Sequence, residues 1–206
     1  MTPRACGICG ASHLTCAAWA LDTAWQTEVP RNAILARNLG QIAESLQSVA
    51  RHHYGLFMID YTNKKYTKSP FYAEAVRRWS AYTGTNYEIG ITISGRPVEI
   101  YALFGGQWPH SSFMVPGGVM CAPTLSDITR SWSLLEYYRK TWLEPCWLGC
   151  SLERYEEVKS MADFQAWLSG PDFTAGHAQH REGGPVGTAS ELWSFDLLEL
   201  EGPAST

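Results

Sequence analysis

The chain begins with a short motif in which two cysteines and a histidine could bind a metal ion. Cys6 and Cys9 are separated by Gly7 and Ile8, and His13 follows shortly after. This spacing, with a glycine between the cysteines, can turn both sulfurs toward one point, and a following helix N-terminus favours their thiolate form. Soft sulfur ligands select zinc, copper(I), iron–sulfur clusters or nickel over magnesium or calcium. The motif therefore predicts a soft-metal site without deciding which metal it holds.

Three other interpretations of this motif stay open. Cys6 and Cys9 could be small buried apolar residues. They could form a thioredoxin-like redox pair, but that expects a preceding strand, and none is expected before Cys6. They could also bind a structural zinc ion together with His13, although a fourth ligand is not evident. Of the remaining cysteines, Cys16 and Cys121 are expected to be buried apolar residues.

Composition limits the classes of partner. The 206 residues are 45% hydrophobic and 17% charged, with a net charge of -4, so no basic field is expected to hold nucleic acid or an anionic membrane. Nine tryptophans and ten tyrosines favour a protein interface. No apolar run is long enough for a membrane span and no secretory leader is evident. We expect a soluble, cytoplasmic protein, with any membrane association made through partner subunits.

Two helices are expected to position the motif. Apolar residues from Leu14 to Trp25 recur at steps of three and four, which predicts a helix directly after the cysteines. A second helix starts near Pro30 and is predicted to pack along a helical neighbour. Its apolar stripe consists of Leu35, Leu39, Ile42, Leu46 and Val49. Its off-stripe residues, expected to face solvent or a polar partner, are Arg37, Glu44 and Arg51.

The remaining chain alternates helices with one predicted hairpin and a loop. A third helix starts at Ser69-Pro70, and a fourth, capped by Thr124 and Asp127, ends before Pro145. Residues 160–168 contain a further helix start, at Ser160 with Asp163. Ile89, Ile91 and Ile93 alternate before a turn at 94–97 and a second alternating run at 98–102, which predicts a β-hairpin. Residues 105–123 are rich in glycine and proline and predict a shaped loop. The fold class is therefore α+β, mostly helical, with long packed helices and one small β-hairpin. Residues 1–168 form the expected core and 169–206 a loosely ordered tail.

The motif as a whole resembles a known family. Arg4, Cys6, Cys9 and His13 are similar to the first metal-binding motif of nickel–iron hydrogenase large subunits. The resemblance continues through residues 30–54, which look like a long family helix ending in a histidine-aromatic segment. It extends through the glycine-rich loop, with its Gly-Gly-Gln-Trp-Pro-His and Val-Pro-Gly-Gly stretches. It covers about residues 4 to 168 and is closest to uptake-type enzymes.

This resemblance implies an oxidoreductase that oxidises H2 reversibly to protons and electrons. Cys6 would be a terminal nickel ligand, Cys9 would bridge nickel and iron, and His13 would lie beside them. The implied cofactor is a Ni-Fe centre whose iron carries CO and cyanide ligands. The implied partner is an iron–sulfur small subunit that takes up the electrons.

The chain departs from the family pattern in two places. The family has a second Cys-x-x-Cys-x-x-His motif near its C-terminus, and Cys146 and Cys150 do not match that spacing. The family segment before the first motif is also missing, so we expect a fragment. The alternative is a non-catalytic module that keeps the family interface but binds no nickel.

The other histidines are expected to have ordinary roles. His110 is expected to be an exposed or hydrogen-bonded loop residue. His52 and His53 cannot face the same way on a helix, so one is expected to be packed and the other solvated. His177 and His180 have ligand-like spacing, but incidental placement is the preferred interpretation.

Overall fold

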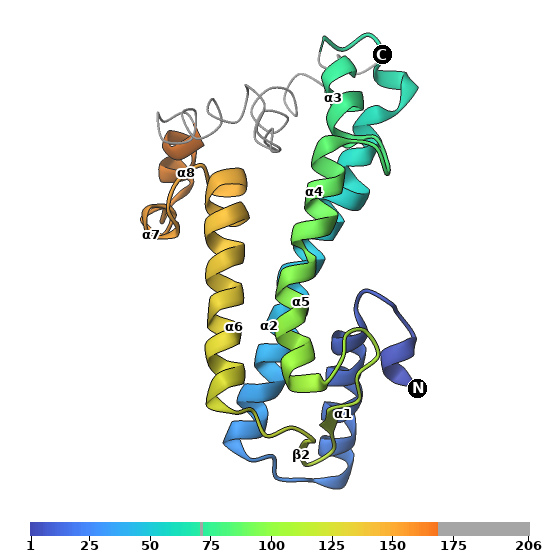
Figure 1. Ribbon diagram of the computed structural model, residues 1–206, viewed down its shortest axis with the longest axis vertical. Coiled ribbons are helices and arrows are strands. Elements are labelled where there is room, and N and C mark those ends of the chain that lie inside the picture. The colour runs from blue at the N-terminus through green and yellow to red at the C-terminus, as the bar shows by residue number, and fades with distance from the viewer. Residues whose placement is uncertain (71, 169–206) are drawn as a thin grey trace. The chain divides into compact units, whose positions relative to one another are not determined.

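The structure is a computed structural model that describes residues 1–70 and 72–168 (Figure 1). Its fold is mostly helical with one small antiparallel sheet in the described part of the chain, which confirms the predicted class. The α-helices are α1 (Gly10–Trp25), α2 (Arg31–His52), α3 (Tyr72–Trp79), α4 (Thr85–Ile93), α5 (Gly95–Gly105), α6 (Leu125–Tyr138), α7 (Leu152–Tyr155) and α8 (Met161–Leu168). Shorter turns are η1 (Thr2–Arg4), η3 (Met58–Thr62) and η4 (Lys64–Tyr66), and the π-helical segments are η2 (His53–Phe57) and η5 (Arg139–Leu148). None of the described helices is both long and apolar enough to cross a membrane.

The chain divides into two compact units. The first consists of Met1–Asp60 and Gly90–Glu136, and the second consists of Tyr61–Ile89 and, of the residues from 137 on, the described part up to 168. The cysteine motif lies in the first unit. The domain boundary expected at residue 168 stays a prediction, because the tail 169–206 lies outside the described residues.

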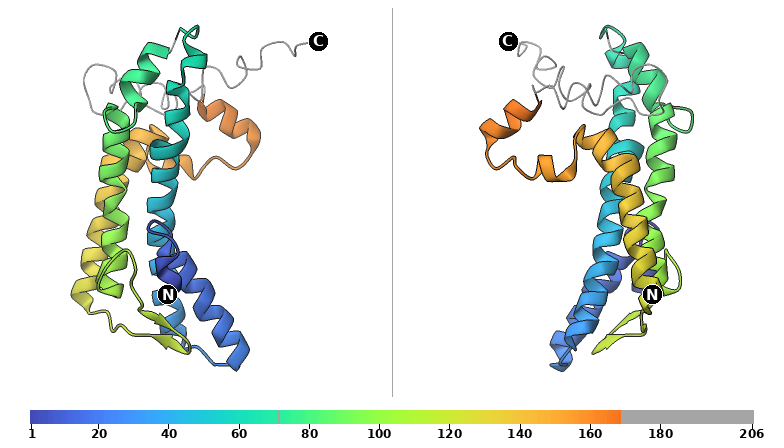
Figure 2. Two further views of the ribbon diagram at one scale, coloured as in Figure 1. Left: turned by 90° about the vertical axis from the view of Figure 1, so that its right-hand side faces the viewer. Right: turned by 60° about the vertical axis from the view of Figure 1, so that its left-hand side comes forward.

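Helix α2 is the central element of the first unit and packs against α1, α5 and the small sheet (Figure 2). Its contact with α5 is the most extensive of these, which confirms that α2 runs along a helical neighbour. The face that makes the contact is not the predicted one. Leu35, Leu39 and Ile42 are 50%, 45% and 55% exposed. The buried face instead carries Ala33, Ala36, Arg37, Gly40, Ala43, Glu44, Gln47 and Ala50.

Small side chains explain why this face is the buried one. Alanine and glycine let neighbouring segments approach closely. A Cβ at Gly40 would lie 3.2 Å from the Tyr101 ring of α5 and 3.0 Å from Phe113. The polar members of the face can be buried because they hydrogen-bond to backbone groups, as described below. Periodicity located the helix, but the choice of face depended on shape and hydrogen bonding.

The predicted hairpin over residues 89–102 is wrong, because these residues form the end of α4 and nearly all of α5. The alternating isoleucines are accommodated in a helix that packs against η2. There Gly90 lies so close to Tyr54 that an added Cβ would be 2.4 Å from the tyrosine Cβ. Pro97, expected in a turn, lies in the first turn of α5, where the missing N–H has no intrahelical partner to lose. Tertiary packing thus overrode the local period of two.

The small sheet lies instead inside the predicted glycine-rich loop. Strands β1 (Met114–Val115) and β2 (Gly118–Val119) pair antiparallel, with Met114 opposite Val119 and Val115 opposite Gly118. Gly117 in the connecting turn has a φ of +81°, a conformation that glycine adopts at little cost.

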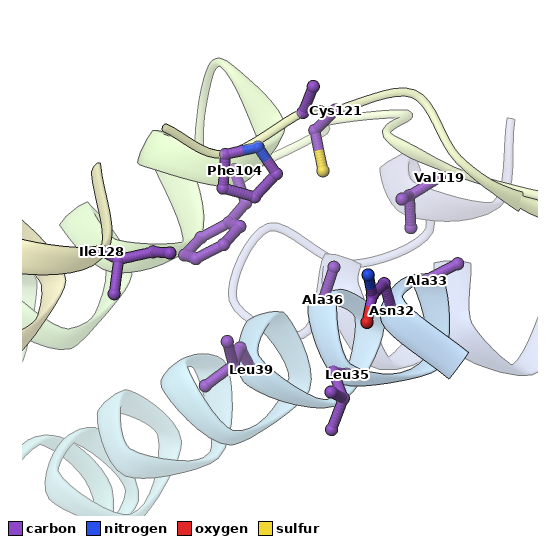
Figure 3. A pocket seen from close by; sticks show the side chains of 11 residues that line it. Asn32, Ala33, Leu35, Ala36, Leu39, Phe104, Val119, Cys121 and Ile128 are labelled. Atoms are coloured by element: carbon purple, nitrogen blue, oxygen red, sulfur yellow. The ribbon is translucent and has the colours of Figure 1, made fainter. Parts of the chain in front are cut away.

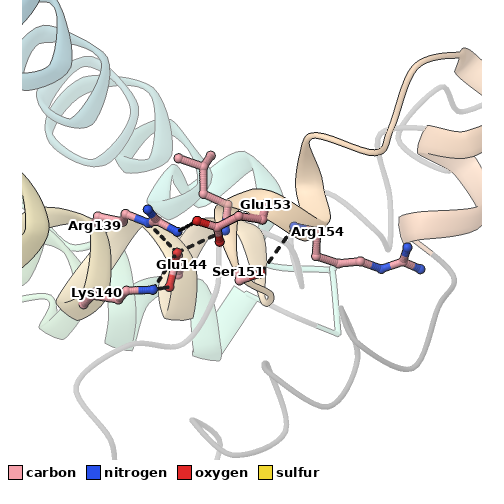
Figure 4. Close-up of polar contacts among 7 residues, drawn as sticks. Arg139, Lys140, Glu144, Ser151, Glu153 and Arg154 are labelled. Carbon is pink, nitrogen blue, oxygen red and sulfur yellow. Dashed lines mark hydrogen bonds and ion pairs between the residues drawn. The ribbon is translucent and has the colours of Figure 1, made fainter.

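The fourth predicted helix begins as expected but does not end before Pro145. Thr124 and Asp127 cap α6 reciprocally, with Asp127 N donating to Thr124 Oγ1 over 3.2 Å and Thr124 N donating to Asp127 Oδ2 over 2.8 Å. Helical backbone then continues through η5, which contains Pro145. Ion pairs of Glu144 with Arg139 (2.6 Å) and Lys140 (2.9 Å) support this continuation (Figure 4).

Two other predicted helix starts lie close to where they were expected. Asp163 N donates to Ser160 Oγ over 3.1 Å, and Ser160 N donates to Asp163 Oδ2 over 2.9 Å, at the start of α8. The third predicted helix corresponds to α3, which begins at Tyr72.

The core of the first unit fixes α1 in place. It joins residues of α1, α2, α5, β1 and the segment that leads into β1: Ala11, Leu14, Ala18, Ala43, Ile100, Tyr101, Phe104, Phe113 and Met114. The Tyr101 and Phe113 rings meet edge to face at 5.2 Å between centroids. Because α1 enters this core from its second residue, Ala11, the cysteine motif is joined directly to a packed helix.

Candidate metal centre

The structure brings Cys6, Cys9 and His13 together at the N-terminus of α1. Cys6 follows η1, Cys9 is the N-cap residue of α1, and His13 lies in the first turn. One donor atom from each of the three side chains lies within 4.8 Å of the other two. The two cysteines are half-buried and His13 is exposed. In the described residues, no second group of three or more Cys, His, Asp or Glu side chains converges in this way.

In this structure Cys6 and Cys9 are joined as a disulfide. The backbone N–H of Cys9 also donates to Cys6 Sγ over 3.2 Å. Metal ligation requires both sulfurs as thiolates, so the pair must be reduced before it can bind an ion. The reduced donor set of two thiolates and one imidazole suits a soft or borderline metal such as nickel or zinc.

A buried carboxylate on α2 holds the first turn of α1. Glu44 is 1% exposed and accepts hydrogen bonds from the backbone N–H groups of Ala11 (2.7 Å) and Ser12 (2.8 Å). It also accepts from Ser12 Oγ over 2.9 Å. These are N–H groups that a helix cannot satisfy internally. Glu44 was expected to face solvent or a polar partner, and its partner is the helix end beside Cys9.

The glycine-rich loop reaches the same place through Trp108, which also lies against Arg51 of α2. Trp108 Nε1 donates to Glu44 Oε2 over 3.2 Å. The Arg51 guanidinium lies 5.2 Å from the Trp108 ring centroid and its Nε donates to Ser94 Oγ over 2.9 Å. The loop therefore closes over the α2 carboxylate, and sequence periodicity gave no signal for this contact.

His110 and Gln47 support the segment before α1. His110 Nδ1 lies 2.9 Å from the Pro3 carbonyl oxygen, which confirms the expected hydrogen-bonded loop histidine. The Gln47 amide, oriented by its hydrogen bonds, donates to the Ile8 carbonyl over 3.1 Å. A Cβ at Gly10 would lie 2.9 Å from the Pro3 carbonyl oxygen, so this position requires glycine. The motif is thus held on both sides of its cysteines.

A buried ion pair fixes the other end of α1. Arg37 Nη1 donates to Asp22 Oδ2 over 2.6 Å, and both side chains are at most 10% exposed. Arg37 Nη2 also donates to the Val115 carbonyl (2.6 Å), and Gly117 N donates to Asp22 Oδ1 (2.7 Å). The hydrogen bond from Arg37 lowers the pKa of Asp22 despite its burial. This network ties α1, α2 and the small sheet together.

The other predicted residues are distributed away from the motif. Cys16 is exposed, so the prediction that it is buried is wrong, and Cys121 is half-buried, where burial raises the pKa of its thiol. His53 is buried and His52 exposed, as expected. Burial, followed by the charge of His52, lowers the pKa of His53 to about 4. His177 and His180 lie outside the described residues.

An apolar pocket of about 500 Å³ opens between α2, α5 and the segment after β2 (Figure 3). Leu39, Phe104 and Ile128 line it, and Cys121 contributes its thiol. None of the three candidate metal donors is among its lining residues, so this pocket is separate from the motif.

Comparison with known proteins agrees with the chemistry of the motif. Residues 1–83 match the family described as nickel-dependent hydrogenase. The chain is 30% identical over 139 residues to the periplasmic [NiFeSe] hydrogenase large subunit of Desulfomicrobium baculatum, an alignment that covers 61% of this chain and 27% of that protein. It is 38% identical over 61 residues to one subunit of the F420-non-reducing hydrogenase vhu of Methanocaldococcus jannaschii, covering 30% of this chain and 15% of that protein.

The chain therefore spans about a quarter or less of the length of these relatives. The similarity nevertheless includes the whole cysteine motif and helices α1 and α2. The family match confirms the resemblance drawn from the sequence: residues 1–83 of this chain are similar to the nickel-dependent hydrogenases.

Proposed function

We propose that this chain is the portion of a hydrogenase large subunit that provides the first two cysteine ligands of a Ni-Fe centre. The observation that carries the proposal is the convergence of Cys6, Cys9 and His13 at the start of α1, inside the segment that matches the nickel-dependent hydrogenases. The reaction proposed for the assembled enzyme is the reversible oxidation of H2 to protons and electrons.

The chain's own residues would have distinct roles at this centre. Cys6 would be a terminal nickel ligand and Cys9 a thiolate shared by nickel and iron. When bound, the centre would supply the site of heterolytic H2 cleavage, with CO and cyanide on its iron. His13, exposed beside the two sulfurs, would hydrogen-bond near the centre or pass protons to solvent. Helix α1 and the core behind it would keep the donors in place.

The described residues offer half of the cysteine ligands that the family resemblance implies. Cys16, Cys121 and Cys150 do not belong to the converging group. We therefore propose that a further segment or chain supplies the second cysteine pair. An iron–sulfur small subunit would accept the electrons, consistent with the large-subunit name of the Desulfomicrobium relative. The cytoplasmic location expected from the sequence stays a prediction, and that relative is a periplasmic enzyme.

Metal content and hydrogen-dependent activity test this proposal. In the protein purified with its partner subunit, we expect near-stoichiometric nickel and iron by elemental analysis, and H2-dependent dye reduction. Cys9→Ala should abolish both, because a shared ligand is lost. Cys16→Ala is the matched control, since Cys16 is exposed and outside the donor group, and it should leave both unchanged. Dye reduction that survives Cys9→Ala would contradict the assignment.

A non-catalytic module is the second candidate, favoured by the incomplete donor set. It would keep the family scaffold and bind no nickel. Purified complex without nickel or iron would support it, whereas a single zinc ion per chain would support a structural site at Cys6, Cys9 and His13.

A further inference from the structure

The buried carboxylate of Glu44 lies at the point where the metal motif meets the rest of the fold. It is 1% exposed and belongs to α2, more than thirty residues from the motif. Its hydrogen-bond donors all come from outside its own helix: Ala11 N, Ser12 N, Ser12 Oγ and Trp108 Nε1. A carboxylate with this many donors is well compensated for its burial.

The bonds of Glu44 act on the helical turn that carries two of the three metal donors. Ala11 and Ser12 lie between Cys9 and His13, so a shift of this turn moves the Cys9 sulfur and the His13 imidazole together. The third donor, Cys6, is held from another direction, through η1 and the bond between Pro3 and His110. The relative position of the donors therefore depends on how firmly α2 holds the first turn of α1.

The Glu44 carboxylate also lies at the positive end of the α1 helix dipole. A carboxylate at a helix N-terminus is stabilised by the N–H dipoles of the first turn. The sequence motif around Cys6 and Cys9 does not include Glu44, because Glu44 lies on α2, 33 residues after Ala11.

We propose that Glu44 is a positioning residue for the metal site: it fixes the first turn of α1 so that the Cys6 and Cys9 sulfurs can converge on one cation with the His13 imidazole beside them. This inference rests on the proposed function for its biological meaning. Whether α2 fixes the positions of the donor atoms through Glu44 can be measured without hydrogenase activity.

The first test compares nickel binding by the reduced full chain with that of Glu44→Gln. The carboxamide is nearly isosteric, but its NH2 group is a donor and cannot accept the hydrogen bond that one of the two backbone N–H groups now makes, so the first turn should loosen. We expect the affinity for Ni²⁺ to fall about tenfold, equivalent to about 1.4 kcal/mol. The thiolate-to-nickel charge-transfer absorption should weaken or shift. Ser12→Ala removes one donor to Glu44 and should change both quantities in the same direction by less.

Asp22→Asn is the matched control, because it makes the same chemical change in a buried carboxylate at the far end of α1. It should reduce stability while leaving the affinity for Ni²⁺ within about twofold, roughly 0.4 kcal/mol, per folded molecule. Should Asp22→Asn fold too poorly, Phe104→Leu provides a destabilised core variant on α5, outside the motif. Equal affinities and spectra for Glu44→Gln and the control would overturn the proposal.

Two metal-free measurements separate this inference from the proposed function. In Glu44→Gln, amide hydrogen exchange at Ala11 and Ser12 should speed up at least tenfold, and in the control it should not. The Cys6–Cys9 disulfide equilibrium with glutathione reports how closely the sulfurs are held. In that exchange two electrons and two protons pass from the thiols to glutathione disulfide, giving two glutathione thiols. The equilibrium constant of this exchange should shift several-fold toward the Cys6–Cys9 dithiol in Glu44→Gln and should stay unchanged in the control.

These results decide the two claims independently. Absence of Ni²⁺ binding in the wild-type chain would count against the proposed function, while the exchange and disulfide measurements would still decide the role of Glu44. If Ni²⁺ binds but all three measurements are unchanged in Glu44→Gln, the proposed function stands and the positioning role is refuted.

Discussion

At the scale of single residues, the polar side chains of α2 are the ones that the sequence pattern could not place. Arg37 and Glu44 interrupt an apolar stripe, and a periodic pattern treats such residues as candidates for solvent or a polar partner. In the structure both are 1% exposed, because each meets groups that its own helix cannot provide. Cys6, Cys9 and His13 could be proposed as a group from local spacing, and the structure brings them together. The residues that hold them in place required the tertiary fold.

The ion pair between Asp22 and Arg37 leads to a stability prediction. Asp22→Asn leaves the Arg37 guanidinium buried without its counter-charge, so we expect the free energy of unfolding to fall by about 3 kcal/mol. Urea unfolding followed by circular dichroism at pH 7 measures this. Asp60→Asn, an exposed carboxylate in the same unit, is the control and should change stability by less than about 0.5 kcal/mol.

The same pair has a defined pH dependence. The pKa of Asp22 is lower in the folded than in the unfolded state, so its contribution is fully present above the unfolded value of about 3.9 and is lost as the pH falls through the folded value. The stability difference between wild type and Asp22→Asn should therefore be constant from pH 7 to about 5 and shrink below about 4. A difference that stays constant to pH 3 would contradict this assignment.

At the scale of elements, prediction succeeded where a helix has capping residues or a long apolar period. The helix after the cysteines, the long α2 and the capped start of α6 were all located. Residues 89–102 were misassigned because isoleucines spaced by two resemble a strand, and the Gly95–Pro97 stretch resembles a turn. These residues form a helix in the structure, where the small Gly90 lets α4 pack closely against Tyr54. This contact exists only in the folded chain, so local sequence could not predict it.

This packing predicts opposite effects for two helical glycines. Gly90→Ala would place a Cβ 2.4 Å from Tyr54 Cβ and 2.6 Å from its Cγ, and Tyr54 is fully buried. Overpacking of this kind should outweigh the gain in helix propensity and lower stability by about 2 kcal/mol. Gly95→Ala meets nothing within 4 Å and should raise stability by up to about 1 kcal/mol. Urea midpoints that move in the same direction for both variants would refute this account.

At the scale of the whole molecule, the apolar stripe of α2 is the main difference between the predicted and observed surfaces. The apolar period predicts that Leu35, Leu39, Ile42 and Val49 form a helix–helix seam, yet each is at least 45% exposed. The small residues on the opposite side form the interior contact instead. An apolar row exposed along one helix favours association of the chain with other apolar surfaces.

Substitutions of two isoleucines can distinguish an effect on folding stability from an effect on association. Ile42 is 55% exposed on α2 and Ile100 is 3% exposed on α5. Ile42→Ala should change the free energy of unfolding by less than about 0.5 kcal/mol, because little of that side chain is buried on folding. Ile100→Ala removes the same atoms from the core and should cost about 3 kcal/mol. Light scattering should also show that Ile42→Ala stays monomeric to higher concentration than the wild type. If Ile42→Ala lowered the free energy of unfolding as much as Ile100→Ala does, the stripe would instead be buried within the chain itself.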